Sequence, residues 1–172
     1  MTNDEKILIE GFCTVTLLAE LFNNEFIESD YFKSLEFQDP AVKKTLSEIN
    51  IGNKGTLLMF LHVLLVLPKE YLSRSFPNEF QLLNEKISNI ATDTSSTYSY
   101  DNKNYKYLKH FRNSISHGKV EFLKNGKIKF FDNTPNGNAK FETNIKINDV
   151  ETVLIPWLQR IVLKLVSEIQ NR

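Results

Sequence analysis

The stretch YLKHFRNSISHG, residues 107–118, is the most informative segment of the chain, because it places charged residues beside a helical apolar stripe. The stripe consists of three apolar residues at helical spacing: Leu108, Phe111 and Ile115. It predicts a helix that starts near residues 101–103 and ends at Gly118, since glycine is favoured just past a helix C-terminus. Arg112 lies about 40° from the stripe on an ideal helix. A charge beside the core is costly unless it is paired or solvated in a cleft.

The second polar residue of this stretch is His117, at the end of the same predicted helix, where the helix dipole favours a cation. Five positions separate it from Arg112, which corresponds to about 140° on the helical wheel. The two side chains therefore do not converge on one helix face by themselves. Either the last turn rewinds before Gly118, or a second copy of the chain completes the site. The structural alternative is that Arg112 pairs with a carboxylate from the acidic N-terminal half while His117 only caps the helix.

The string Arg112-Asn113-x-x-x-His117, at the end of a helix in a mainly helical chain, resembles the R-x-x-x-x-H motif of the HEPN superfamily. The resemblance implies a helical bundle that dimerises and, in catalytic members, cleaves RNA without metal in a cleft shared by two copies. It implies Arg112 and His117 as catalytic residues, with Asn113 and Ser116 in support. The superfamily also contains inactive and ligand-binding members, so a non-catalytic dimerisation module and a nucleotide-binding domain stay open as alternatives.

The chemistry that this resemblance implies needs neither cofactor nor metal. The RNA supplies its own nucleophile, the 2′-hydroxyl, and His117 exchanges protons with that hydroxyl or with the 5′-leaving oxygen. The Arg112 guanidinium matches phosphate oxygens and stabilises charge in the transition state. Asn113 orients the phosphate or His117. The products are a 2′,3′-cyclic phosphate and a 5′-hydroxyl.

Charge is unevenly distributed along a chain whose formal net charge is zero. Residues 1–50 hold ten acidic against four basic residues, and residues 101–130 hold eight basic against two acidic ones. A neutral protein can therefore carry a basic face for RNA, with Lys109, Lys119 and Tyr105 as candidate contacts. Two solvated faces of opposite sign explain the same pattern equally well.

The rest of the chain predicts one mainly α domain, residues 1–172, with a small antiparallel hairpin or three-stranded insertion at 118–147 before the C-terminal helix. Asn125-Gly126 marks the hairpin turn. Helices are expected at 4–24, from Asp39-Pro40, at 54–73 with a possible kink at Pro68, at 77–91, and from Asn148 with Glu151 as its capping partner. Residues 92–97 are polar and predict a loop, and alternation over 141–147 predicts the third strand.

Composition excludes several classes of protein. Hydrophobic residues make up 41% and charged residues 24% of the 172 residues, which argues against disorder. A single cysteine, Cys13, excludes an intramolecular disulfide framework, and both Cys13 and His62 are expected in the core. The apolar run Leu57–Leu67 is too short for a membrane span and the N-terminus is acidic, so a cytoplasmic protein is expected. The HEPN resemblance implies a role as a toxin or an anti-phage effector, with an antitoxin or regulatory protein as partner.

Overall fold

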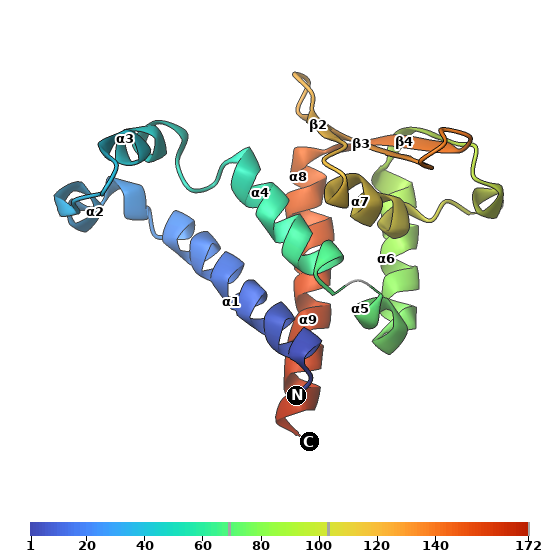
Figure 1. Cartoon of the computed structure of the whole chain (residues 1–172), viewed down its shortest axis with the longest axis horizontal. Helices are drawn as coiled ribbons and strands as arrows, with labels where there is room; N and C mark the ends of the chain where they lie inside the picture. Colours follow the sequence, from blue (N-terminus) through green and yellow to red (C-terminus); the bar gives the residue numbers. More distant parts are fainter. Residues whose placement is uncertain (69, 103, 172) are drawn as a thin grey trace.

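The computed structural model describes residues 1–68, 70–102 and 104–171 of the chain. It is mainly α-helical with a small antiparallel sheet, as predicted (Figure 1). The N-terminal half contains α1 (Asn3–Asn23), a 3-10 turn (Phe26–Glu28), α2 (Asp30–Ser34), α3 (Pro40–Ile49), α4 (Lys54–Leu61), a π-helical turn (His62–Val66), α5 (Tyr71–Ser75) and α6 (Pro77–Ile90). The rest contains β1 (Thr92–Ser96), a 3-10 turn (Ser99–Asp101), α7 (Tyr107–Ser116), β2 (Val120–Phe122), β3 (Lys127–Asn133), β4 (Lys140–Lys146), α8 (Ile147–Asp149), a π-helical turn (Val150–Leu154) and α9 (Ile155–Gln170).

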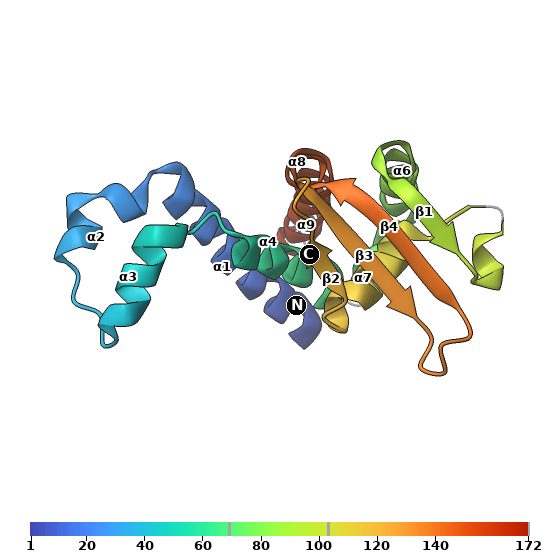
Figure 2. The same cartoon turned by 90° about the horizontal axis from the view of Figure 1, so that it is seen from above.

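The sheet has four strands in the order β1-β4-β3-β2, one more than the predicted insertion (Figure 2). The Asn125-Gly126 turn joins β2 to β3 as expected, with Gly126 at φ +74°. The added strand, β1, comes from the polar residues expected to form a loop. Its backbone pairs with β4 through a bulge between Thr92 and Ser95, so main-chain hydrogen bonding rather than apolar burial places it in the sheet.

The main core lies between the sheet, α7 and α9. One face of the sheet contributes four almost fully buried side chains: Ile128, Phe130, Phe141 and Ile145. Phe111 of α7 stacks on Phe130 with ring centroids 4.2 Å apart, while Leu158 and Val162 of α9 are fully buried in the same cluster. This core fixes α7, the helix that carries the motif, between the sheet and the remaining helices.

A second, smaller cluster holds together an arm formed by the end of α1, α2 and α3. Its buried residues are Ile27, Phe32 and Ile51. The arm projects away from the sheet along the long axis of the molecule (Figures 1 and 2). Helix α3 has no buried residue, although Asp39 caps it as predicted, with Oδ1 accepting a hydrogen bond from the Ala41 N–H at 2.8 Å.

Three local predictions are wrong. Cys13 is exposed, because the buried stripe of α1 runs through Leu8, Phe12 and Val15 and Cys13 falls outside it. His62 is also exposed, at the start of the π-helical turn. Asn148 does not cap the last helix: the helical segment begins one residue earlier, at Ile147, and no side chain caps it.

The predicted helix over 54–73 is interrupted. Helix α4 passes into the π-helical turn at His62–Val66, and α5 begins only at Tyr71. Pro68 lies in this break, where its ring prevents the helix from continuing. In the described chain, no single helix has the length and apolar composition needed to cross a membrane. One pair of helices, Pro40–Ile49 and Lys54–Val66, meets the length and composition criteria when the two are taken together, and it is bent by 90°.

Candidate functional site at the end of helix α7

Helix α7 begins later than predicted, at Tyr107, and ends in a well-formed C-terminal cap. Gly118 takes a left-handed conformation with φ +64°. Its N–H donates to the Ile115 carbonyl, and the Lys119 N–H donates to the Ser114 carbonyl at 2.7 Å, which is the hydrogen-bond pattern of a Schellman motif. The cap fixes the backbone at His117, whose side chain is exposed.

Arg112 lines a polar cleft of about 1080 Å³ between α6 and the segment that leads into α7. Its side chain is 24% exposed, and Nη1 lies 3.9 Å from Glu70 Oε1. Glu70 is itself 54% exposed and is held by Arg74 at 2.5 Å. The expected carboxylate partner therefore exists, but the long distance and the competing arginine leave Arg112 only loosely paired.

The structure keeps Arg112 and His117 apart within one chain. Among the described residues, no hydrogen bond or ion pair joins the two side chains. Arg112 lines the cleft and also a second, smaller hollow that includes Ser116, whereas His117 lines neither. The last turn of α7 is not rewound to bring them together, because His117 N–H still donates to the Asn113 carbonyl at 3.0 Å.

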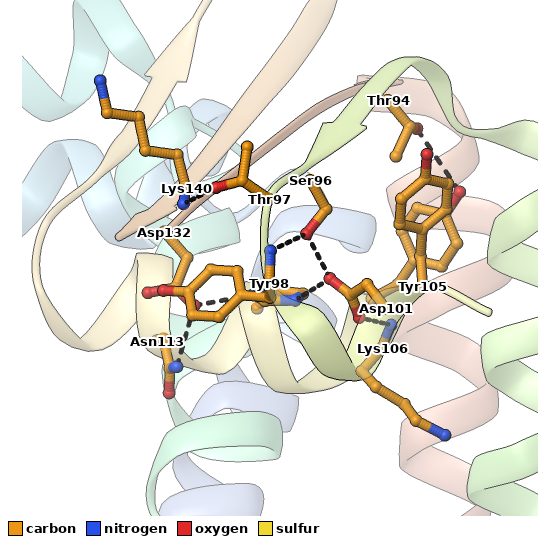
Figure 3. Close-up of polar contacts among 12 residues, drawn as sticks. Thr94, Ser96, Thr97, Tyr98, Asp101, Tyr105, Lys106, Asn113, Asp132 and Lys140 are labelled. Carbon is orange, nitrogen blue, oxygen red and sulfur yellow. Dashed lines mark hydrogen bonds and ion pairs between the residues drawn. The ribbon is translucent and has the colours of Figure 1, made fainter. Parts of the chain in front are cut away.

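A chain of buried polar groups lies beneath the motif. His110 is fully buried, with Nδ1 2.7 Å from Asp132 Oδ2 and Nε2 2.9 Å from Asp101 Oδ2. Asn113 donates from Nδ2 to the same Asp132 oxygen at 3.0 Å (Figure 3). Asp101 also accepts hydrogen bonds from Ser96 Oγ at 2.5 Å and from the backbone N–H of Lys106 at 3.0 Å. The network thus ties β1, β3 and the entry of α7 to the motif residue Asn113.

Aromatic rings enclose this network. The His110 ring stacks on Phe141 with centroids 4.0 Å apart and planes 6° apart, and Tyr98 and Tyr100 cover it from other sides. Burial, followed by the nearby Asp132 carboxylate, raises the pKa of Tyr98 to about 12. Burial also raises the pKa of Tyr100 to about 12, with smaller contributions from Tyr98 and the two aspartates. Both hydroxyls therefore stay protonated beside the aspartates at neutral pH.

The family model described as HEPN pEK499 p136 matches residues 1–168. The chain belongs to this HEPN family. Searches of curated proteins and of solved structures give no match. Membership in a HEPN family indicates a nuclease or nucleotide-related function in general. In this HEPN domain the motif helix is α7, and the four-stranded sheet covers its buried face.

The predicted RNA contacts of the HEPN domain separate into two groups. Tyr105 and Lys109 line the cleft together with Arg112. The exposed Lys109 ammonium lies 4.1 Å from the centre of the Tyr100 ring, and Tyr105 packs edge-on against Tyr107. Lys119 instead donates a hydrogen bond to Asn133 Oδ1 in the sheet and is not a cleft residue. In the described part of the chain, no group of three or more His, Cys, Asp or Glu side chains is arranged so that it could hold a metal ion.

Sequence reasoning missed the buried aspartates of this HEPN domain, although a signal for one of them exists. Asp132 follows Ile128 and Phe130 at period two, so strand alternation places it on the buried face of β3. Similarly, His110 belongs to a second helical stripe with Tyr107, Phe111 and Ser114. Contact between this helical stripe and the buried face of β3 depends on how α7 packs against the strand, which no local pattern specifies.

Proposed function

We propose that this HEPN domain is a metal-independent endoribonuclease, with Arg112 and His117 as its catalytic residues. The observation that carries the proposal is the weak pairing of Arg112 at the cleft. It is an arginine at the wall of a polar cleft, and its one ion pair with a described residue is long and involves a half-exposed glutamate. A phosphate oxygen can replace that partner at little cost, because a guanidinium binds phosphate bidentately.

The proposed reaction uses the 2′-hydroxyl of RNA as nucleophile. His117, exposed at the end of α7, accepts the hydroxyl proton or protonates the 5′-leaving oxygen. Arg112 stabilises the negative charge that develops on the phosphorus oxygens. Cleavage leaves a 2′,3′-cyclic phosphate and a 5′-hydroxyl, and neither residue needs a metal or cofactor for these roles.

Two copies of the chain are proposed to form the site. The divergence of Arg112 and His117 in one chain supports this part, since a second motif supplies the missing group at each position. We also propose that this cytoplasmic nuclease acts on cellular or phage RNA as a toxin or defence effector, with an antitoxin or regulatory protein as its partner.

The test is cleavage of labelled single-stranded RNA in EDTA. Wild type should produce cyclic phosphate ends, and Arg112→Ala and His117→Ala should each lose at least about 100-fold in rate, as expected for a transition-state charge and a general acid–base group. Matched controls are Arg160→Ala on α9 and His62→Ala in the π-helical turn after α4, both exposed and neither among the residues that line the cleft. Equal cleavage by all variants would refute the assignment.

Mixing the two inactive variants tests the shared site. A mixture of Arg112→Ala and His117→Ala chains should regain activity that neither variant has alone, because mixed dimers contain an intact Arg112 and an intact His117. A mixture that stays inactive while the chains exchange would show that each chain must carry both residues.

A second candidate is a non-catalytic interaction module, favoured by the exposed apolar side chains of the arm. Among them are Phe22, Tyr31, Val42 and Ile49, each between 45% and 66% exposed. Such a surface is typical of contact sites between proteins. A folded wild-type protein that binds a partner through the arm but leaves RNA intact in the assay above would favour this candidate.

A further inference from the structure

The buried network beneath the motif determines which atom Asn113 offers to a ligand. Asp132 is 3% exposed, and its Oδ2 accepts a hydrogen bond from Asn113 Nδ2 and lies 2.7 Å from His110 Nδ1. An ionised carboxylate only accepts hydrogen bonds, so the Asn113 amide nitrogen must face inward. Figure 3 shows this nitrogen toward Asp132 and the Asn113 oxygen pointing away from it.

The hydrogen-bond geometry around His110 supports this arrangement. Both ring nitrogens of His110 face carboxylate oxygens, at 2.7 and 2.9 Å. A hydrogen on Nδ1 points to Asp132 Oδ2 and one on Nε2 points to Asp101 Oδ2, so carboxylate acceptors match both ring positions. Asp132 Oδ2 is thus an acceptor both for this ring position and for Asn113 Nδ2, which leaves the Asn113 carbonyl oxygen on the side away from the cluster.

We propose that Asp132, His110 and Asp101 are positioning residues that fix Asn113 with its carbonyl oxygen toward the substrate, where it accepts a hydrogen bond from the ribose 2′-hydroxyl. This inference rests on the proposed function, since it takes RNA as the ligand of the site. It also revises the expectation that Asn113 orients the phosphate. A carbonyl oxygen repels phosphate oxygens, but it binds and aligns a hydroxyl donor.

Binding experiments test the inference without requiring cleavage. The probe is a single-stranded RNA oligonucleotide compared with its 2′-fluoro counterpart, which lacks the hydroxyl donor. In the His117→Ala background, which is designed not to cleave, the RNA should bind about fivefold more tightly than the 2′-fluoro oligonucleotide. This is the effect of one neutral hydrogen bond. Adding Asn113→Ala should abolish this preference. A preference that survives Asn113→Ala, or none in His117→Ala, would overturn the inference.

A swap of the two side chains tests the positioning role. Asn113→Asp alone places two carboxylates against each other with no N–H between them, so cleavage should fall at least about 100-fold. Combining it with Asp132→Asn restores the contact, because the new amide on β3 donates to the carboxylate introduced on α7, while one oxygen of that carboxylate still faces the ligand. The double variant should recover at least about tenfold over Asn113→Asp, and Asn136→Asp in an exposed loop is the matched control.

The outcomes separate this inference from the proposed function. No recovery in a folded double variant would mean that Asn113 acts as a donor, and the inference would fail while the nuclease assignment stands. If wild type does not cleave RNA at all, the proposed function fails, and the RNA preference in the binding experiment still decides whether Asn113 accepts from a 2′-hydroxyl. Thermal unfolding of each variant confirms that it is folded.

Discussion

This HEPN domain has two regions: the body, which is the sheet with α7, α9 and the helices packed on them, and the arm. Both contain buried phenylalanines, but different kinds of contact hold them together. The body core joins segments far apart in the sequence, such as Phe111 of α7 and Phe130 of β3. The arm cluster draws only on residues 18–51, with Phe32 at its centre. Among the described residues, the buried polar cluster of His110, Asp101 and Asp132 lies in the body alone. Accurate placement of polar groups therefore accompanies the non-local core, and we expect changes in the arm to leave that core undisturbed.

The largest expected effect comes from removing a buried ring in the body. Phe111→Ala deletes a fully buried side chain stacked at 4.2 Å on Phe130, so the free energy of unfolding of the whole domain should fall by about 3–5 kcal/mol. Urea denaturation followed by circular dichroism measures this loss.

The same substitution in the arm should have a local effect. Phe32 is 2% exposed but belongs to a small separate cluster. Phe32→Ala should therefore speed amide hydrogen exchange in α2 and α3 and leave the amides of α7 protected. If Phe32→Ala destabilises α7 as much as Phe111→Ala does, body and arm form one cooperative unit and the comparison fails.

A smaller effect is expected at the start of α3. Asp39 caps this helix, which has no buried residue, so Asp39→Ala should cost about 1 kcal/mol in the local stability of α3. Hydrogen exchange of the α3 amides provides the measurement. Glu36→Ala, an exposed acidic residue of the same arm, is the control. Unchanged exchange in α3 would show that contacts with the rest of the arm, rather than the cap, hold this helix.

The smallest effect concerns alkaline pH and the aromatic cover of the buried cluster. The folded pKa of Tyr98 is raised to about 12, above its ordinary value of about 10. Its contribution to stability is therefore fully present below pH 10 and is lost as pH rises from about 10 to 12. Tyr98→Phe should make the decline in unfolding free energy over this window shallower than in wild type. Tyr31→Phe, in the arm and 66% exposed, is the control, and equal slopes for all three proteins would contradict the assignment.

Local sequence was enough to predict most helices, the Asn125-Gly126 hairpin and the motif, because periodicity, caps and turn residues act over a few neighbours. The end of α7 is an example, since Gly118 alone predicts the left-handed cap that the structure contains. The same local logic failed where a break or an edge depends on distant partners. Residues 92–96 form a strand because β4 offers an open edge, and their polar sequence contains no local signal for a strand.

The support of the motif, in contrast, depends on tertiary packing. The helical wheel already separated Arg112 from His117, and the structure keeps them apart. The helical wheel could not reveal that Asp101 and Asp132 meet at His110, because Asp101 comes from a turn, Asp132 from a strand and His110 from a helix. A buried charge is tolerated only where the fold supplies its partners, so such a cluster becomes visible when the strands and α7 are packed together.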